Sequence, residues 1–235
     1  MVLAGMTLGA VGAPAELPPD GVEFSTQITR TYGLNYLLAL PEGYAENRRQ
    51  HYPIVIFLHG SGERGEDLNV VRVNGPFKEI AQGRKFPFIL VAPQCPAKGW
   101  WDVEVLSHLL TSIEKKYRVD RDRVYLTGLS MGGYGTWAWA TAEPKRFAAL
   151  APICGGGDPE QAAKLVGIPT WVTHGDADTA VPIVQSIAMV EAIRKAGGTI
   201  RFDIIKGGTH DVWSPVYANP EFYDWLMAQN RKSRP

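Results

Sequence analysis

The stretch VYLTGLSMGGYG, residues 124–135, decides the fold. Its first half is rich in β-branched and aromatic residues and predicts a strand, whereas residues 131–142 predict a helix. Ser130 falls at the turn between the two, with Gly128 and Gly132 two residues away on either side. Glycine tolerates the close chain approach of such a turn, where a Cβ would clash. A serine in this position projects its hydroxyl above the end of the sheet from a strained backbone.

Predicted strands and helices alternate on both sides of this turn. Continuous apolar runs are typical of strands covered on both faces, and apolar residues at helical spacing indicate the segments between them. Strands are expected at 22–28, 35–40, 53–58, 88–92, 123–127, 147–153, 169–173 and 199–205, and helices after Asp102, at 131–142, after Asp158, at 182–196 and at 215–228. The order predicts a three-layer α/β fold whose mostly parallel sheet has an antiparallel N-terminal edge.

Composition narrows the function classes. Of 235 residues, 45% are hydrophobic and 20% charged, which is typical of a globular protein. Lys plus Arg and Asp plus Glu number 24 each, so the net charge of zero argues against nucleic acid or an anionic membrane as the main partner. No apolar run reaches the roughly 18 residues that a membrane span needs.

The length suits one catalytic domain, expected over residues 22–235. Residues 1–21 are small and apolar at first and then rich in proline, so they are expected to be either a connector or the remnant of a targeting signal. The second alternative would make the protein secreted or periplasmic, and the first leaves a cytoplasmic location open.

Serine alone is a weak nucleophile and requires a base. Behind a turn of this kind the expected chain order is serine, acid, histidine. Five histidines are present, and only His210 follows both Ser130 and the acid candidates, in a loop after the last predicted strand. The alternative is a serine that merely caps the helix, but the strand before it and the helix after it favour a nucleophile.

The acid should lie between Ser130 and His210. The carboxylates in this interval are Glu143, Asp158, Glu160, Asp176, Asp178, Glu191 and Asp203. Asp178 is favoured because it lies farthest into the loop that leaves the strand 169–173, and Asp176 is expected to brace that loop. These carboxylates and His174 lack the usual spacings of metal ligands, so neither a metal nor a cofactor is expected.

An oxyanion hole needs two backbone N–H donors. Met131, directly after the nucleophile, supplies one candidate, and Ser61 in the glycine-rich loop 59–65 supplies the other. His59 is then expected to steady the loop. Trp100, Trp101 and Trp213 follow predicted strands at the same edge, so they either line a substrate pocket or pack the loops onto the sheet.

These motifs resemble the α/β-hydrolase superfamily, and within it the dienelactone hydrolase and phospholipase/carboxylesterase-like serine esterases, some of them labelled predicted peptidases. The resembling stretches are FLHGSGERG (57–65), VYLTGLSMGGYG (124–135), HGDADTAVP (174–182) and GTHDVW (208–213). The resemblance implies an α/β-hydrolase fold in which Ser130 is nucleophile, Asp178 orienting acid, His210 base, and Ser61 and Met131 oxyanion donors. Dienelactone hydrolases proper use cysteine, so Ser130 points to the esterase side.

The expected activity is therefore that of a serine carboxylesterase that cleaves short-chain or small aromatic esters through an acyl-enzyme. Residues 155–168 are too few to hold a lid domain between two consecutive strands, which favours an open site. A peptidase or amidase with the same residues and a non-catalytic binding module of the same fold are the alternatives. Cys95 and Cys154 are expected to be free thiols, and the oligomeric state stays open.

Overall fold

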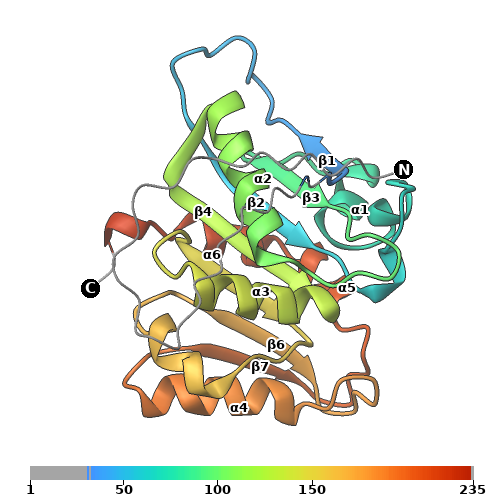
Figure 1. Cartoon of the computed structure of the whole chain (residues 1–235), viewed down its shortest axis with the longest axis vertical. Helices are drawn as coiled ribbons and strands as arrows, with labels where there is room; N and C mark the ends of the chain where they lie inside the picture. Colours follow the sequence, from blue (N-terminus) through green and yellow to red (C-terminus); the bar gives the residue numbers. More distant parts are fainter. Residues whose placement is uncertain (1–30, 32, 234–235) are drawn as a thin grey trace, which may run out of the picture. The chain divides into compact units, whose positions relative to one another are not determined.

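One seven-stranded sheet organises residue 31 and residues 33–233, the part of the chain that this computed structural model describes (Figure 1). Its strands are β1 (Tyr36–Ala39), β2 (Tyr52–Leu58), β3 (Ile89–Pro93), β4 (Val119–Leu129), β5 (Ala149–Ile153), β6 (Trp171–Gly175) and β7 (Arg201–Ile205). They lie in the order β1-β3-β2-β4-β5-β6-β7, all parallel except β1, which pairs antiparallel with β3. The mostly parallel sheet with an antiparallel edge is thus confirmed, whereas the strand expected at 22–28 and the segment 1–21 lie outside the described residues.

Helices cover both faces of the sheet and make it the middle of three layers (Figure 1). They are α1 (Gly75–Ala81), α2 (Val103–Lys116), α3 (Met131–Ala142), α4 (Val184–Lys195), α5 (Trp213–Ala218) and α6 (Pro220–Met227). Alternate residues of a strand point to opposite faces. Accordingly Ile54 and Ile56 of β2 pack in one core with α2, α3 and α4, and Val55 and Phe57 pack in the other with α1, α5 and α6.

Local signals explain where several elements begin. Asp102 caps α2 by accepting hydrogen bonds from the N–H groups of Glu104 and Val105 at 2.9 and 3.2 Å. Asp158 likewise caps the segment Pro159–Leu165, which is a 3-10 helix. This helix is the one element between β5 and β6 in the described structure, so the connection holds no lid domain.

The last predicted helix, 215–228, is wrong as a single element. The chain forms α5 and α6 instead, and Asn219 between them is extended, with φ −77° and ψ 121°. Pro220 has no N–H for a continuing helix and disfavours the helical conformation of the residue before it. Within the described residues, no helix has both the length and the apolar character that crossing a membrane requires.

Candidate active site

The strand ends bring the predicted site residues to one edge of the sheet. Leu58 at the end of β2 pairs with Gly128 of β4, and Leu129 pairs with Ile153 of β5. The packing is so close that a Cβ at Gly132 would overlap the carbonyl group of Leu58. The glycines around the turn are therefore needed for close approach, and Ser130 emerges between the ends of β2 and β5.

Ser130 has a strained backbone. Its φ of 53° and ψ of −119° lie outside the regions that L-residues normally occupy, and its N–H donates to the Ile153 carbonyl at 2.9 Å. Ser130 is the residue before α3, so the helix N-terminus lies next to its hydroxyl. This is the strand–turn–helix geometry that a nucleophilic serine uses.

Ser130, His210 and Asp178 form a continuous hydrogen-bond chain. Nε2 of His210 lies 2.9 Å from the Ser130 Oγ, and Nδ1 of His210 lies 2.6 Å from Oδ2 of Asp178. Because a carboxylate only accepts, the Nδ1 proton is donated to Asp178 and Nε2 is left to accept from the serine hydroxyl. The loop thus brings to His210 the aspartate that the sequence favoured.

Asp178 is held as an anion. Its side chain is fully buried, and the N–H groups of Ala180 and Val181 both donate to Oδ1 at 2.9 Å. Burial alone raises the pKa of this carboxyl, but the hydrogen bonds from His210 and from these two amides outweigh it, so the pKa is lowered overall. An ionised Asp178 can stabilise a protonated His210.

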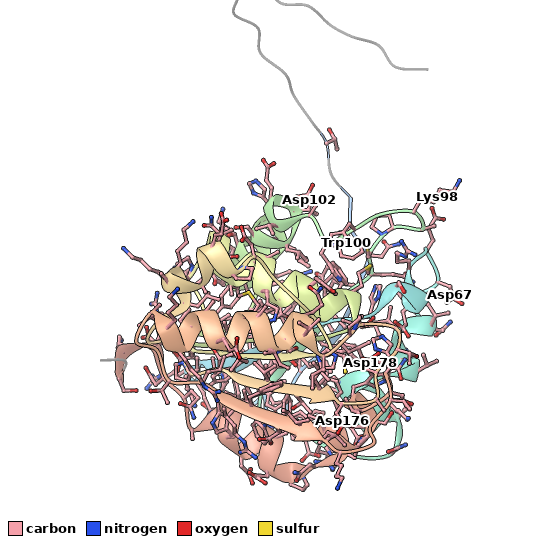
Figure 2. All side chains as sticks on the ribbon, turned by 90° about the horizontal axis from the view of Figure 1, so that it is seen from below. Asp67, Lys98, Trp100, Asp102, Asp176 and Asp178 are labelled. Atoms are coloured by element: carbon pink, nitrogen blue, oxygen red, sulfur yellow. The ribbon has the colours of Figure 1, made fainter. Side chains whose placement is uncertain are left out.

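Asp176 lies at the same end of β6 as Asp178 (Figure 2), but its side chain stabilises the loop. Its Oδ1 accepts from the Gly207 N–H at 2.6 Å and ties the loop after β6 to the loop after β7. His174 is fully buried and lies 3.3 Å from Oδ2 of Asp178 through Nε2. The same nitrogen lies 2.8 Å from the Val181 carbonyl, and Nδ1 lies 2.7 Å from the Ser186 Oγ.

Cys154, His174 and Asp178 form the cluster of potential metal ligands that the described residues contain, with ligand atoms within 4.8 Å of one another. The donor set fits a metal poorly. Nε2 of His174 must donate to the Val181 carbonyl, so it has no lone pair to offer. Burial raises the pKa of the Cys154 thiol to about 12, whereas a metal ligand must be a thiolate. No sequence pattern predicts that Cys154 approaches the aspartate. Both cysteines are buried and free, as expected.

The loop after β2 passes directly beside Ser130. A Cβ placed on Gly60 would lie 3.6 Å from the Ser130 Cβ and 2.9 Å from Cδ1 of Leu129. Ser61 begins the 3-10 helix Ser61–Glu63. Within the described part of the chain, the N–H groups of Ser61 and Met131 donate to no backbone acceptor outside regular elements. Both residues begin a helix, where backbone N–H groups have no partner within the helix.

His59 is held neutral in the core. Its Nδ1–H donates to the Gly60 carbonyl at 2.6 Å, and its Nε2 accepts from the Cys95 N–H at 2.9 Å. Burial lowers the pKa of His59, which the Gly60 hydrogen bond only partly offsets. His59 therefore steadies the loop and has no free nitrogen to act as a base.

The three tryptophans at this edge have different surroundings. Trp101 is buried, with its ring 4.8 Å from that of His59, so it packs the loop. Trp213 stands edge-on to His210 at 5.1 Å. Trp100 is 58% exposed and lies 6.1 Å from the ring of Tyr134. The sequence analysis did not place Tyr134 near the site. Its position one helical turn after Ser130 on the predicted helix would have indicated that the two lie on the same face.

Comparisons with known proteins place the chain among esterases. A family model described as "Putative esterase" matches residues 70–194, just over half of the chain, which includes Ser130 and Asp178. A probable feruloyl esterase C of Aspergillus terreus is 25% identical over 218 residues, covering 86% of this chain and 78% of the relative. The corresponding protein of Aspergillus flavus is 31% identical over 130 residues, which is 52% of this chain and 46% of that protein.

The chain is also similar in fold to solved structures. A thermostable esterase is 32% identical with a TM-score of 0.74, covering 84% of this chain and 59% of that chain. The feruloyl esterase module of Clostridium thermocellum, solved with sinapinate, is 20% identical with a TM-score of 0.59 over 81% of both chains, which shows the fold alone. The chain thus spans little more than half of the thermostable esterase and about half of several curated relatives.

Proposed function

Because the chain belongs to the putative esterase family, we propose that it is a serine carboxylesterase with Ser130, His210 and Asp178 as its catalytic residues. The observation that carries this proposal is the chain of hydrogen bonds from the Ser130 Oγ through His210 to Asp178, at 2.9 and 2.6 Å. This arrangement lets Nε2 of His210 accept the Ser130 hydroxyl proton while Nδ1–H donates to Asp178.

The order of steps in the reaction follows from the hydrogen-bond geometry of Ser130, His210 and Asp178. The Ser130 Oγ attacks the ester carbonyl carbon while Nε2 of His210 takes the hydroxyl proton. The N–H groups of Ser61 and Met131 donate to the carbonyl oxygen as it becomes negative, and Asp178 stabilises the imidazolium. The C–O bond to the alcohol then breaks, and His210 returns the proton to the leaving oxygen. Water activated by His210 hydrolyses the acyl-enzyme and releases the acid.

Small or aromatic carboxylic esters are the substrates we propose. The short connection between β5 and β6 leaves the site open and builds no long acyl tunnel over it. The exposed ring of Trp100, next to Tyr134, offers an aromatic face, and Trp213 adjoins the base. Curated relatives are named feruloyl esterases, whose acyl group is aromatic. Trp101 is not part of this surface because its side chain is buried.

One sheet supplies every group of this mechanism, from strands that begin at Tyr36 and end at Ile205. We therefore propose that residues 22–235 form a single catalytic domain. Removing residues 1–21 should leave kcat unchanged, and loss of hydrolysis from a folded, shortened chain would contradict a single domain.

A panel of esters tests the activity. Nitrophenyl acetate, butyrate, octanoate and palmitate are compared with methyl ferulate and with the anilide that matches the best ester. We expect hydrolysis of the short and aromatic esters, none in Ser130→Ala, and slow cleavage of the anilide. A preference for palmitate or faster cleavage of the anilide would contradict the proposal.

A further inference from the structure

Asn74 occupies a capping position without capping its helix. It is the N-cap of α1, and asparagine is among the residues best suited to that role, yet its side chain makes no hydrogen bond to the helix. Instead Nδ2 donates to Oε1 of Glu63 at 2.7 Å, and Oδ1 accepts from Nε1 of Trp213 at 3.2 Å. Asn219, the N-cap of α6, does cap, accepting from the Glu221 N–H at 3.0 Å.

The two hydrogen bonds of the Asn74 side chain form a bridge between Glu63 and Trp213. The Glu63 end of this bridge lies in the loop that carries Ser61. Glu63 ends the 3-10 helix Ser61–Glu63, and its side chain is only 10% exposed. Its Oε2 is buried without a hydrogen-bond partner, 3.8 Å from Nδ1 of His59. Asn74 is thus the side chain that hydrogen-bonds this carboxylate among the described residues. The amide of Asn74 thus holds the carboxylate of Glu63, while Gln94 donates to the carbonyl of the same residue at 2.9 Å.

The other end of the bridge supports the base. Trp213 is the first residue of α5, three residues after His210, and its ring stands at 89° to the imidazole with the centroids 5.1 Å apart. The Val212 N–H donates to the His210 carbonyl at 3.0 Å, which keeps this segment tight. A shift of the indole therefore moves the surface against which the imidazole rests.

The middle of the bridge is anchored to the sheet. Gly75, next to Asn74, has a φ of 66°, and a Cβ there would lie 2.6 Å from ring carbons of Phe57 in β2. Only glycine fits such a position without strain. The residue that follows Asn74 therefore packs closely against the sheet that also carries Ser130.

We propose that Asn74 is a positioning residue that couples the loop bearing the Ser61 N–H to the segment bearing His210. The proposal rests on the proposed ester hydrolysis, in which proton transfer by His210 and donation by Ser61 act on one transition state. Both groups must keep their places relative to Ser130, because donors act on the oxyanion only over a narrow range of distance. An error of about 1 Å can reduce the rate by about 100-fold.

Asn74→Ala, with Asn219→Ala as the matched control, provides the first test. We expect kcat for nitrophenyl butyrate to fall about 10- to 100-fold in Asn74→Ala while KM changes less than about threefold. Asn219→Ala loses a capping bond and should lower Tm without lowering kcat. Equal kcat in both variants, or a kcat of Asn74→Ala within twofold of the wild type, would overturn the proposal.

A swap of donor and acceptor separates positioning from folding. Asn74→Asp sets a carboxylate against Glu63 and should lower kcat at least as much as Asn74→Ala. Adding Glu63→Gln restores a hydrogen bond in the reverse direction, and the Trp213 indole still finds an acceptor. We expect the double variant to recover kcat to within about threefold of the wild type. A double variant that folds but stays as slow as Asn74→Asp would sink the proposal.

Labelling of Ser130 by a fluorophosphonate keeps this test distinct from the test of ester hydrolysis. Labelling requires the nucleophile, the base and the oxyanion donors but no ester turnover. A wild type that labels without hydrolysing esters would refute the esterase, and a tenfold slower labelling in Asn74→Ala would still support the positioning role. Equal labelling rates would refute that role, and a wild type that does neither refutes both.

Discussion

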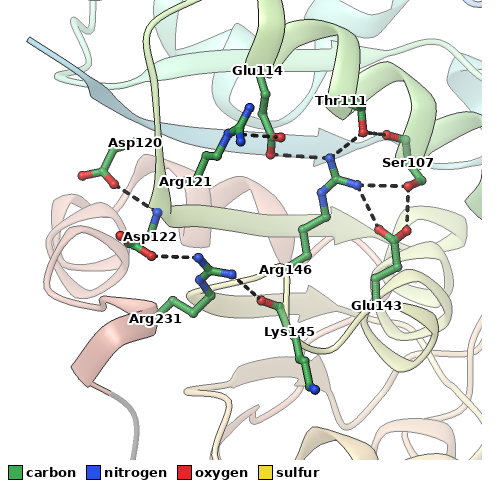
Figure 3. Close-up of polar contacts among 10 residues, drawn as sticks. All are labelled: Ser107, Thr111, Glu114, Asp120, Arg121, Asp122, Glu143, Lys145, Arg146 and Arg231. Carbon is green, nitrogen blue, oxygen red and sulfur yellow. Dashed lines mark hydrogen bonds and ion pairs between the residues drawn. The ribbon is translucent and has the colours of Figure 1, made fainter.

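The two ends of the sheet use polar groups in opposite ways. At the end where the strands begin, Arg146 lies between α2 and α3 and contacts four groups (Figure 3). Its guanidinium lies 3.5 Å from Glu114 and 3.3 Å from Glu143, and it donates to the hydroxyls of Ser107 and Thr111 at 3.0 and 2.9 Å. The charges and hydrogen-bonding groups of this network are thus paired with one another.

A second pair of contacts closes the same end. Arg231 near the C-terminus donates to Asp122 of β4 at 2.8 Å and to the Lys145 carbonyl at 3.0 Å (Figure 3). The opposite end of the same strands carries Ser130 with positive φ. One end of the sheet therefore holds the layers together, while the other end carries the strained backbone at Ser130.

Ser130→Ala tests the reactive end with the largest effect. Removal of the nucleophile should lower kcat at least about 10⁴-fold, because single losses from such a triad are of this size or larger. Chemical denaturation should show a free energy of unfolding close to that of the wild type, since the substitution leaves the fold intact. Substantial turnover in this variant would mean that another group attacks the ester.

Asp178→Asn should lower kcat about 10³- to 10⁴-fold. The amide can donate to Nδ1 of His210, which then presents the wrong tautomer to Ser130, and the negative charge beside the imidazolium is lost. Asp176→Asn is the matched control and should keep kcat within about threefold, since Asp176 contacts the Gly207 N–H and not His210. Equal losses in both variants would remove Asp178 from the mechanism.

Gly60→Ala probes the loop beside Ser130. A Cβ there meets Leu129 at 2.9 Å and Glu63 at 3.2 Å, so the loop must shift, and we expect kcat to fall about tenfold. Gly62→Ala is the control because a Cβ on Gly62 meets nothing within 4 Å. Steady-state kinetics of the two variants provide the test. A Gly60→Ala variant as active as Gly62→Ala would place the oxyanion donor elsewhere.

Arg146→Met tests the other end and should change stability rather than rate. Its side chain is 19% exposed, and its loss leaves Glu114 and Glu143 without their shared cation, so the free energy of unfolding should fall by about 2 kcal/mol. Arg121→Met removes a partner of the same Glu114 from a side chain that is 64% exposed and should cost under about 0.5 kcal/mol. Urea unfolding measures both, and a large loss of kcat in Arg146→Met would contradict the separation of the two ends.

The smallest effect is the pH dependence of that network. Burial raises the pKa of Glu143, but hydrogen bonds from Ser107 and Trp139 and the charge of Arg146 lower it overall. Glu143 therefore adds stability above the ordinary pKa of glutamate, and this part is lost as the pH falls through its lowered pKa. The gap in unfolding free energy between the wild type and Arg146→Met should be narrower at about pH 3 than at about pH 7. A gap that widens in acid would contradict this assignment.

Local patterns accounted for most of the fold because their causes are local. The run 53–58 is apolar on both faces in the sequence and is the buried β2, and Asp102 was recognised as a cap from its place before a helical pattern. Pro220 separates α5 from α6, because proline restricts the backbone of its immediate neighbours. The apolar spacing of residues 215–228 continues across Pro220 and therefore predicted one helix. Helix α1, with seven residues, was too short for a periodic signal.

The sequence predicted the candidate active site only in part, for a different reason. Gly128 and Gly132, two residues from Ser130 on either side, identify the serine, and the expected chain order then selects His210. The preference for Asp178 over Asp176 depends instead on how far each residue reaches into its loop. The contact of Trp101 with His59 and the bridge made by Asn74 join segments that are distant in the sequence. No pattern within one segment specifies them, because they depend on where other loops come to lie.

Local sequence patterns alone specify the order of the strands along the chain, the turn that strains Ser130 and the chemical types of the groups near it, because backbone propensity, burial pattern and glycine requirements act over a few residues. Tertiary packing specifies which aspartate meets His210, which tryptophans are buried and what Asn74 holds. Those choices arise from the packing of loops at the ends of parallel strands, where side chains far apart in the chain compete for a few hydrogen-bond partners.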